Sequence, residues 1–150
     1  MFKIFRSIVR RGDTYAIADD ISSDDAKNLW VNRAPGATVV AERGDDIFGT
    51  AKFGPIRSAS GAHIANASYM VAPGWQGRGV GRTLCEYSLQ WARDHDYRGV
   101  QFNAVVETNE HAVRLYESLG FTIIGTVPGA FHHPTRGYVG LHVMYLDLTQ

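Results

Sequence analysis

Apolar residues in the second half of the chain recur with the spacing of helices and strands. From residue 80 the apolar or partly apolar positions lie three or four apart, which is one face of an amphipathic helix: Val80, Leu84, Tyr87, Ser88 and Trp91. The mostly apolar run over 100–106 predicts a short buried strand. Helical spacing returns before Gly120, a residue type that commonly ends helices, at Ala112, Leu115, Tyr116 and Leu119.

The first half of the chain shows shorter patterns separated by turns. Residues 2–17 have a strand-like pattern with a turn at 11–13, and Ser22 followed by acidic residues begins a helix. A polar loop that contains proline, 128–137, is expected between the last two strands. The remaining alternating segments predict a β-hairpin from 37–42 and 46–53, and further strands at 63–71, 121–127 and 138–146.

The order of these elements limits the fold class. A strand, a helix and a strand over 63–106 imply a parallel strand pair within a mixed sheet, so the class is α/β or α+β. The chain has 150 residues, of which 45% are hydrophobic, and we detect no internal repeat or linker. We therefore expect residues 1–150 to form a single domain.

Charge and cysteine content exclude several classes of protein. The chain has 15 basic and 15 acidic residues, which argues against a general nucleic-acid binder. Its one cysteine, Cys85, rules out an intramolecular disulfide framework and fits a reducing compartment. We find neither a secretory leader nor an apolar run long enough to cross a membrane. A soluble cytoplasmic protein without nucleic-acid or membrane partners is expected.

Glycines gather directly before the predicted helix, at positions 74, 77, 79 and 81. A helix N-terminus presents unpaired N–H groups, and glycine lets a phosphate approach them without meeting a Cβ atom. A P-loop would require glycine at 76 and lysine at 82, and a dinucleotide fingerprint would require glycine at 82, but the chain has Gln76 and Arg82. The segment therefore predicts a phosphate-bearing ligand bound by another motif.

Two motifs resemble the GNAT superfamily of N-acetyltransferases. Residues 76–81, Gln-Gly-Arg-Gly-Val-Gly, are similar to its pyrophosphate loop Q/R-x-x-G-x-G/A. A second segment is similar to the family's N-x-x-A-x-x-L-Y-x-x-x-G-F pattern at Asn109, Ala112, Leu115, Tyr116, Gly120 and Phe121. The resemblance covers 47–148 and implies the GNAT fold, a mixed and mostly antiparallel sheet with a splayed central parallel strand pair and flanking helices.

Two shorter segments, 66–71 and 102–109, also resemble the fungal branch that acetylates L-azetidine-2-carboxylate and related proline analogues.

The resemblance implies that acetyl-CoA is the co-substrate and lies where strands 63–71 and 100–106 splay apart. Main-chain N–H groups of the glycine loop would hold the pyrophosphate. Arg78 and Arg82 either add charge there or are solvated surface arginines. A backbone N–H at Met70 or Val71 is nominated to stabilise the oxyanion. The residues expected to bind acetyl-CoA are Met70, Val71, Gln76, Gly77, Arg78, Gly79, Val80, Gly81, Arg82 and Asn109.

Tyr116 matches the family tyrosine that protonates or hydrogen-bonds the leaving thiolate. A phenol with a pKa of about 10 holds its proton at neutral pH and can lend it to a thiolate. The alternative is a core tyrosine on the apolar stripe of its helix. No carboxylate occurs in 63–75, so the general base stays open among His63, Glu107, His142, a water chain and an acceptor that is already neutral.

Asn66 and Asn103 stand in apolar strand segments, where asparagine is disfavoured. Either they are two buried amides with satisfied hydrogen bonds, or they orient a polar acceptor such as an amino-acid carboxylate or its amine. We count them with Tyr116 as candidate catalytic residues. His132 and His133 have no third ligand at a suitable spacing, so we predict no metal.

These observations together predict an acetyl-CoA-dependent N-acetyltransferase that acts on the amine of a small metabolite or an amino-acid-like compound. The resemblance is also compatible with a homodimer. Two alternatives remain: a protein or peptide N-acetyltransferase, and an acyl-CoA-binding sensor without turnover.

Overall fold

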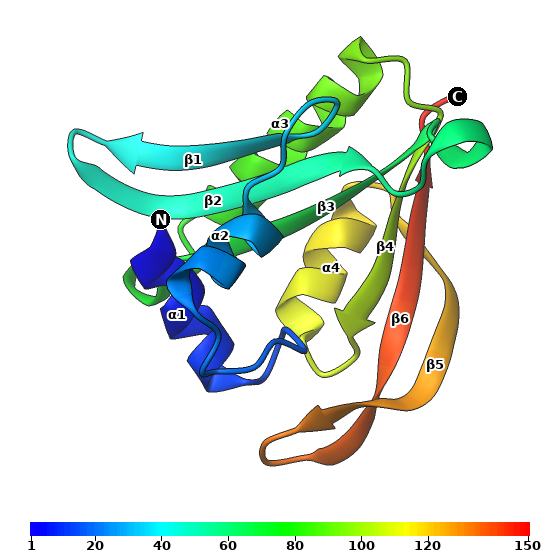
Figure 1. Ribbon diagram of the computed structural model, residues 1–150. Helices are drawn as coiled ribbons and strands as arrows, with labels where there is room; N and C mark the ends of the chain where they lie inside the picture. The colour runs from blue at the N-terminus through cyan, green and yellow to red at the C-terminus, as the bar shows by residue number, and fades with distance from the viewer.

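The computed structural model describes residues 1–150 as four α-helices around one six-stranded sheet (Figure 1). The strand order across the sheet is β1-β2-β3-β4-β6-β5. Short 3-10 turns lie at Ala59–Gly61 and Pro73–Trp75. The elements in chain order are α1 (Phe2–Arg11), α2 (Ser23–Trp30), β1 (Ala37–Arg43), β2 (Asp46–Pro55), β3 (Ile64–Val71), α3 (Val80–Asp94), β4 (Gly99–Val106), α4 (Glu110–Ser118), β5 (Thr122–His133) and β6 (Gly137–Asp147).

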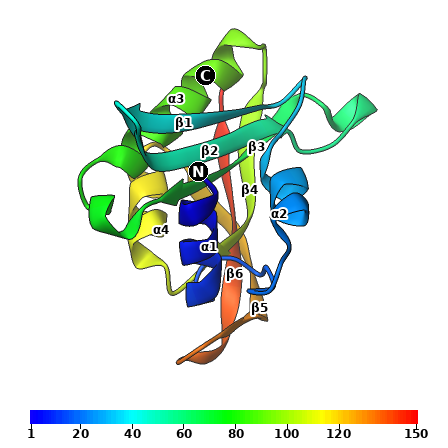
Figure 2. The same cartoon turned by 60° about the vertical axis from the view of Figure 1, so that its left-hand side comes forward.

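Helices cover both faces of the sheet (Figure 2). Successive residues of β3 point to opposite faces, as in any strand. Met70 packs with Phe5 of α1 and Trp30 of α2 on one face. Tyr69 packs on the other face, where its hydroxyl is 2.6 Å from that of Ser88 in α3 and its ring lies 6.2 Å from that of Tyr116 in α4. β3 therefore lies between two apolar cores. None of the helices is long and apolar enough to cross a membrane.

The structure confirms the predicted mixed sheet. β1 and β2 form the expected antiparallel hairpin, and β3 and β4 form the expected parallel pair. Helix α2 begins as predicted, because the Ser22 hydroxyl accepts a hydrogen bond from the Asp25 N–H at 3.1 Å. Helix α4 is followed by Gly120 at φ 95°, a left-handed conformation that glycine adopts without strain.

The strand predicted at the N-terminus is wrong, because residues 2–11 form helix α1. Its buried residues recur in helical spacing, with Ile4 and Phe5 one turn before Ile8 and Val9, and they pack against α2 and Met70. The predicted turn at 11–13 is the end of this helix, where Gly12 takes a left-handed conformation at φ 64°.

The loop predicted over 128–137 is also largely wrong. β5 continues to His133, and only 134–136 connect it to β6. The pairing register shifts between Val127 and Phe131, so Pro128 lies in an irregular part of an edge strand, where a missing N–H donor disrupts no central ladder. The longer hairpin brings Phe131 to the end of the cleft described next.

Candidate active site

A cleft opens in the sheet because β3 and β4 separate soon after they begin. The two strands pair only at Ile64–Gly99 and Ala65–Val100, whereas β3 stays paired with β2 as far as Val71. Just beyond the last pair, the Asn66 side chain spans the gap and donates from Nδ2 to the Gln101 carbonyl at 2.7 Å. The resulting cleft has a volume of about 1070 Å³ and is lined by residues of both strands, α1, α3 and α4.

The hydrogen-bond alternation of β3 determines which backbone groups face this cleft. The Ala72 N–H donates to the Phe48 carbonyl, so every second residue back along β3, including Met70, directs its N–H and C=O toward β2. Val71, Tyr69 and Ala67 direct theirs toward the gap. Of the two residues nominated for an oxyanion, Val71 thus presents its N–H to the cleft, whereas the N–H of Met70 belongs to the β2 ladder.

The glycine loop forms one end of the cleft and leads into α3. Gly77 and Gly79 have φ values of 73° and 84°, and a Cβ atom at either position would meet no protein atom within 4 Å. The first helical hydrogen bond runs from the Thr83 N–H to the Gly79 carbonyl, at 3.0 Å. The N–H groups of residues 80–82 therefore have no partner within the helix, and the open backbone in front of them fits a pyrophosphate.

The side chains around this loop have partners of their own. Arg82 donates to the Ser118 hydroxyl of α4 at 2.6 Å, and Arg78 lies over the Trp75 ring at 5.2 Å from its centroid. Gln76 Nε2 lies 3.5 Å from the Val71 carbonyl. Asn109 caps α4 by accepting from the Ala112 N–H at 3.3 Å. All four residues lie at the glycine-loop end of the molecule or at the start of α4, and all except Arg78 line the cleft.

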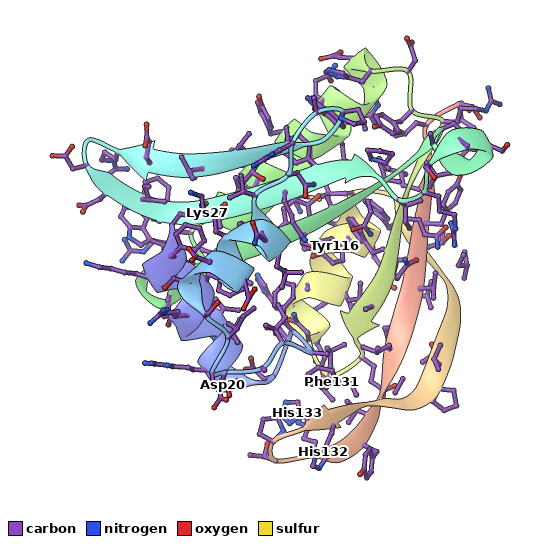
Figure 3. The ribbon with its side chains drawn as sticks, in the orientation of Figure 1. Asp20, Lys27, Tyr116, Phe131, His132 and His133 are labelled. Atoms are coloured by element: carbon purple, nitrogen blue, oxygen red, sulfur yellow. The ribbon has the colours of Figure 1, made fainter.

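Tyr116 belongs to α4 (Figure 3) and lines the cleft. Its ring packs at 4.6 Å from that of Phe102 and 5.9 Å from that of Phe121. Burial raises the pKa of its phenol well above the usual value, and no hydrogen bond to the protein lowers it. The side chain is thus part of the core, as the alternative interpretation required, and also presents a protonated hydroxyl to the cleft.

Residues 6–121 match the Acetyltransferase (GNAT) family profile. The chain belongs to this family of acetyltransferase enzymes. In the comparison of folds, a GCN5-related N-acetyltransferase from Kribbella flavida has a TM-score of 0.95 and 50% identity, over 99% of this chain and 90% of that one. YncA from Salmonella typhimurium, determined with its cofactor acetyl-CoA, has a TM-score of 0.82 and 25% identity, over 99% of this GNAT chain and 86% of that one.

Two sequence relatives are also N-acyltransferases by name. The N-acetyltransferase aca1 of Schizosaccharomyces pombe is 32% identical over 55% of this chain, and the matched part covers 40% of the relative's length. The L-amino acid N-acyltransferase MnaT of Escherichia coli is 33% identical over 77% of this GNAT chain and 69% of its own length.

Tyr15, which was not predicted from the sequence as a site residue, binds the backbone of β3 within the GNAT cleft. Its hydroxyl donates to the Tyr69 carbonyl at 2.7 Å and accepts from the Tyr69 N–H at 3.2 Å. Both backbone groups that Tyr69 turns toward the gap are therefore occupied. Burial raises the pKa of the Tyr15 phenol, so the hydroxyl stays protonated and keeps both bonds. These bonds tether the segment after α1 to the cleft.

Neither asparagine is a fully buried core amide. Asn66 is half-buried and Asn103 is exposed, and both line the cleft. The Asn103 side chain lies in the irregular part of β4, with its Oδ1 accepting from Gln101 Nε2 at 2.6 Å. Asn66 thus has a bond that holds the two strands at the point where they part, whereas Asn103 has only a neighbouring side chain as partner.

We expect different results from replacing the two asparagines with alanine. Asn66→Ala removes the donor to Gln101, so it should lower the free energy of unfolding by about 1–2 kcal/mol, whereas Asn103→Ala should change it by less than about 0.5 kcal/mol. If Asn103 orients the acceptor, its removal should raise the acceptor's KM and leave that of acetyl-CoA unchanged. Urea unfolding and steady-state kinetics on both variants measure these effects. Unchanged acceptor kinetics for Asn103→Ala would remove that residue from the site.

None of the three side chains proposed as a general base lines the cleft. His63 precedes β3 at the paired end of the two strands, where its carbonyl accepts from the Arg98 N–H. Glu107 accepts from the Gly140 N–H, and the His142 ring bonds the Thr126 hydroxyl at 2.7 Å. The cleft lining contains no aspartate or glutamate, and its one imidazole is that of His111 in the first turn of α4.

His132 and His133 lie at the tip of the β5–β6 hairpin (Figure 3). The His132 ring stacks on Tyr138 at 4.8 Å between centroids, and His133 Nδ1 accepts from the Thr135 N–H at 3.2 Å. No group of three or more His, Cys, Asp or Glu side chains in the chain is arranged to hold a metal ion.

Proposed function

We propose that residues 1–150 act as one acetyl-CoA-dependent N-acetyltransferase domain, and that its acceptor is the amine of an amino acid or a similar small molecule. The observation that carries this proposal is the single cleft that connects the glycine loop, the Val71 N–H and Tyr116. The names of the relatives, an L-amino acid N-acyltransferase among them, support the same acceptor class.

When bound, acetyl-CoA supplies an acetyl group activated as a thioester. The unpaired N–H groups at the start of α3 and the glycine backbone before it bind the pyrophosphate, because both present donors without side chains in the way. The Val71 N–H stabilises negative charge that develops on the acetyl oxygen. Tyr116, which its raised pKa keeps protonated over the whole neutral range, donates its proton to the departing sulfur as the C–S bond breaks. The proton that the acceptor's nitrogen releases on forming the N–C bond restores the phenol.

The shape of the far end of the cleft favours a small acceptor over a peptide. The C-terminus of α1 meets the β5–β6 hairpin there, since a Cβ atom on Gly12 would lie 3.4 Å from Pro134. Phe131 and Leu141 of the hairpin and Ile8 of α1 line this end. The approach of α1 to the hairpin narrows this end of the cleft and disfavours an extended polypeptide there, which is the reason that we place the peptide acetyltransferase second.

The test of this function is a panel of amines assayed by the release of free CoA. Free L-amino acids, their analogues and short peptides are each offered with acetyl-CoA. Release with free amino acids above release with peptides supports the proposal. Release with peptides alone favours the peptide acetyltransferase, and binding of acetyl-CoA without release favours the sensor.

We also predict how the rate depends on pH. Since the cleft lining contains no carboxylate, we propose that the acceptor reacts as its neutral amine. The value of kcat/KM should then rise about tenfold per pH unit up to the pKa of the acceptor's amine and should follow that pKa from one acceptor to the next. Tyr116 adds no falling limb below about pH 10, because its pKa is raised and its proton is lost only above that range. A plateau that begins at the same pH for every acceptor would instead indicate a base supplied by the enzyme, and His111 is the one imidazole in the cleft lining.

We extend the proposal to a cytoplasmic location and a homodimer. The one cysteine, Cys85, is buried and free, as expected in a reducing compartment. β5 is an edge strand with exposed Ile123, Ile124 and Val127, a surface that a second copy of the chain would cover. Sedimentation velocity on the purified chain measures whether it dimerises.

A further inference from the structure

The charges along the cleft are distributed unevenly. Its lining contains three arginines and no carboxylate. Arg82 and Arg114 belong to α3 and α4, and each is paired within its own helix, with Glu86 and Glu110 respectively. Arg11, at the end of α1, is the one cationic side chain that lines the cleft from the side opposite these helices.

The guanidinium of Arg11 is oriented by hydrogen bonds that occupy only some of its N–H donors. Its Nε and Nη2 both donate to one oxygen of Asp13, at 3.2 and 2.7 Å. An arginine has five N–H donors, so three remain without a protein acceptor, and the side chain keeps 43% of its surface exposed. Asp13 does not line the cleft, and its second oxygen is buried without a partner. The carboxylate thus orients the guanidinium from outside the cleft lining.

The neighbours of Arg11 connect it to the reacting end of the cleft. Thr14, Tyr15 and Ala16 line the cleft directly after it. Because the Tyr15 hydroxyl is bonded to both backbone groups of Tyr69, this segment is fixed relative to β3. Val71, whose N–H we assign to the acetyl oxygen, is two residues further along the same strand. The position of Arg11 relative to the site is therefore set by its own bonds to Asp13 and by those between Tyr15 and Tyr69.

We propose that Arg11 binds the carboxylate of the acceptor and so selects α-amino acids over amines that lack this group. The remaining guanidinium donors match a planar carboxylate in geometry and charge. An amino acid held in this way has its amine one carbon away from the anchored carboxylate, so the anchor fixes where the amine can lie. This inference rests on the proposed function and assigns the residue that recognises the acceptor.

The test compares an amino acid with its carboxamide at a pH above the amine pKa of both, because amidation removes the carboxylate charge and also lowers the pKa of the amine. The probes are the free L-amino acid that gives the fastest CoA release in the amine panel and its carboxamide, which keeps the amine and side chain. Wild-type protein should use the acid with a KM at least tenfold below that of the amide. Arg11→Gln should raise the KM for the acid by about 10- to 100-fold, as expected for loss of a charge-assisted hydrogen bond, and should change that of the amide by less than threefold.

Three further variants make the result specific. Arg10→Gln removes the same charge from an exposed neighbour on α1 that does not line the cleft, and it should leave both KM values unchanged. Arg11→Lys keeps the charge without the planar fork, so it should give a KM for the acid between those of wild type and Arg11→Gln. Should Arg11→Gln fold poorly because Asp13 loses its partner, the double variant Arg11→Gln, Asp13→Asn removes both charges together and should show the same selective loss.

The outcomes separate this inference from the function on which it rests. Equal losses for acid and amide in Arg11→Gln, or no loss for either, would overturn the role of Arg11 and leave the acetyltransferase standing. An equal KM of the wild-type protein for the amide and the acid would also overturn the role of Arg11 and leave the acetyltransferase standing. Failure of every amine to release CoA would overturn the proposed function, and the role of Arg11 with it.

Discussion

Replacing Gly79 with glutamate should abolish the thermal stabilisation by acetyl-CoA. Gly79 caps α3 at φ 84°, with open space where a side chain would project. A carboxylate there would face the pyrophosphate, and like charges in contact cost several kcal/mol. In wild-type protein, acetyl-CoA at a hundredfold excess over its Kd should stabilise the fold by about 2.7 kcal/mol, which raises Tm by roughly 5–10 °C. The variant should show almost none of this rise in differential scanning fluorimetry.

Two controls separate charge from backbone strain. Gly79→Ala forces a side chain into the left-handed conformation, at a cost of about 1–2 kcal/mol in stability, but adds no charge and should retain most of the shift. Gly74→Glu places the same charge in open space in the neighbouring turn, outside the cleft lining, and should retain the shift as well. A full shift in Gly79→Glu, or its loss in Gly74→Glu, would contradict the assignment of this loop to the pyrophosphate.

The parts of the site that were predictable from sequence are those encoded locally. The glycine loop and α3 are contiguous, so their spacing alone indicated backbone donors at a helix start, and the structure has them there. Helix α4 and its Gly120 were found for the same reason. The parallel pairing of β3 and β4 followed from connection rules that hold for nearly every strand-helix-strand unit.

Other parts depend on contacts between distant segments and left no local trace. Tyr15 reaches Tyr69 across 54 positions, and no spacing in the sequence marks that pair. The choice between Met70 and Val71 depends on which neighbour each N–H faces, and that alternation is fixed by the pairing with β2. The general-base candidates were chosen by residue type, whereas His63 and Glu107 lie at strand ends and His142 lies within β6, all outside the cleft lining.

The N-terminal helix was missed for a different reason. A short amphipathic helix and a strand both show apolar residues separated by polar ones, and charged residues interrupt the apolar run along the sequence although they lie on the exposed side of α1. The packing of Ile4, Phe5 and Ile8 against α2 and Met70 decides in favour of the helix. Arg11 is the last residue of α1, so without this helix the sequence could not predict that Arg11 lines the acceptor end of the cleft.

Replacing Tyr116 with phenylalanine should lower kcat about 100-fold and leave the KM for acetyl-CoA within about threefold of the wild-type value. Removing the hydroxyl eliminates the proton donor to the departing sulfur, a contribution made mainly in the transition state. The aromatic ring remains and keeps its packing against Phe102 and Phe121. Steady-state kinetics with acetyl-CoA and the best acceptor of the amine panel measure both parameters, and Tm confirms that the fold is intact.

The loss of kcat in Tyr116→Phe should not depend on pH in the neutral range. Burial raises the pKa of Tyr116, so the phenol should stay protonated up to about pH 10 and the wild-type and Tyr116→Phe profiles should run parallel between pH 7 and pH 9. Tyr87→Phe makes the same chemical change on the exposed side of α3, outside the cleft lining, and should leave kcat unchanged. Wild-type kcat in Tyr116→Phe would exclude Tyr116 as the donor, because the departing sulfur would then be protonated at the same rate without its hydroxyl.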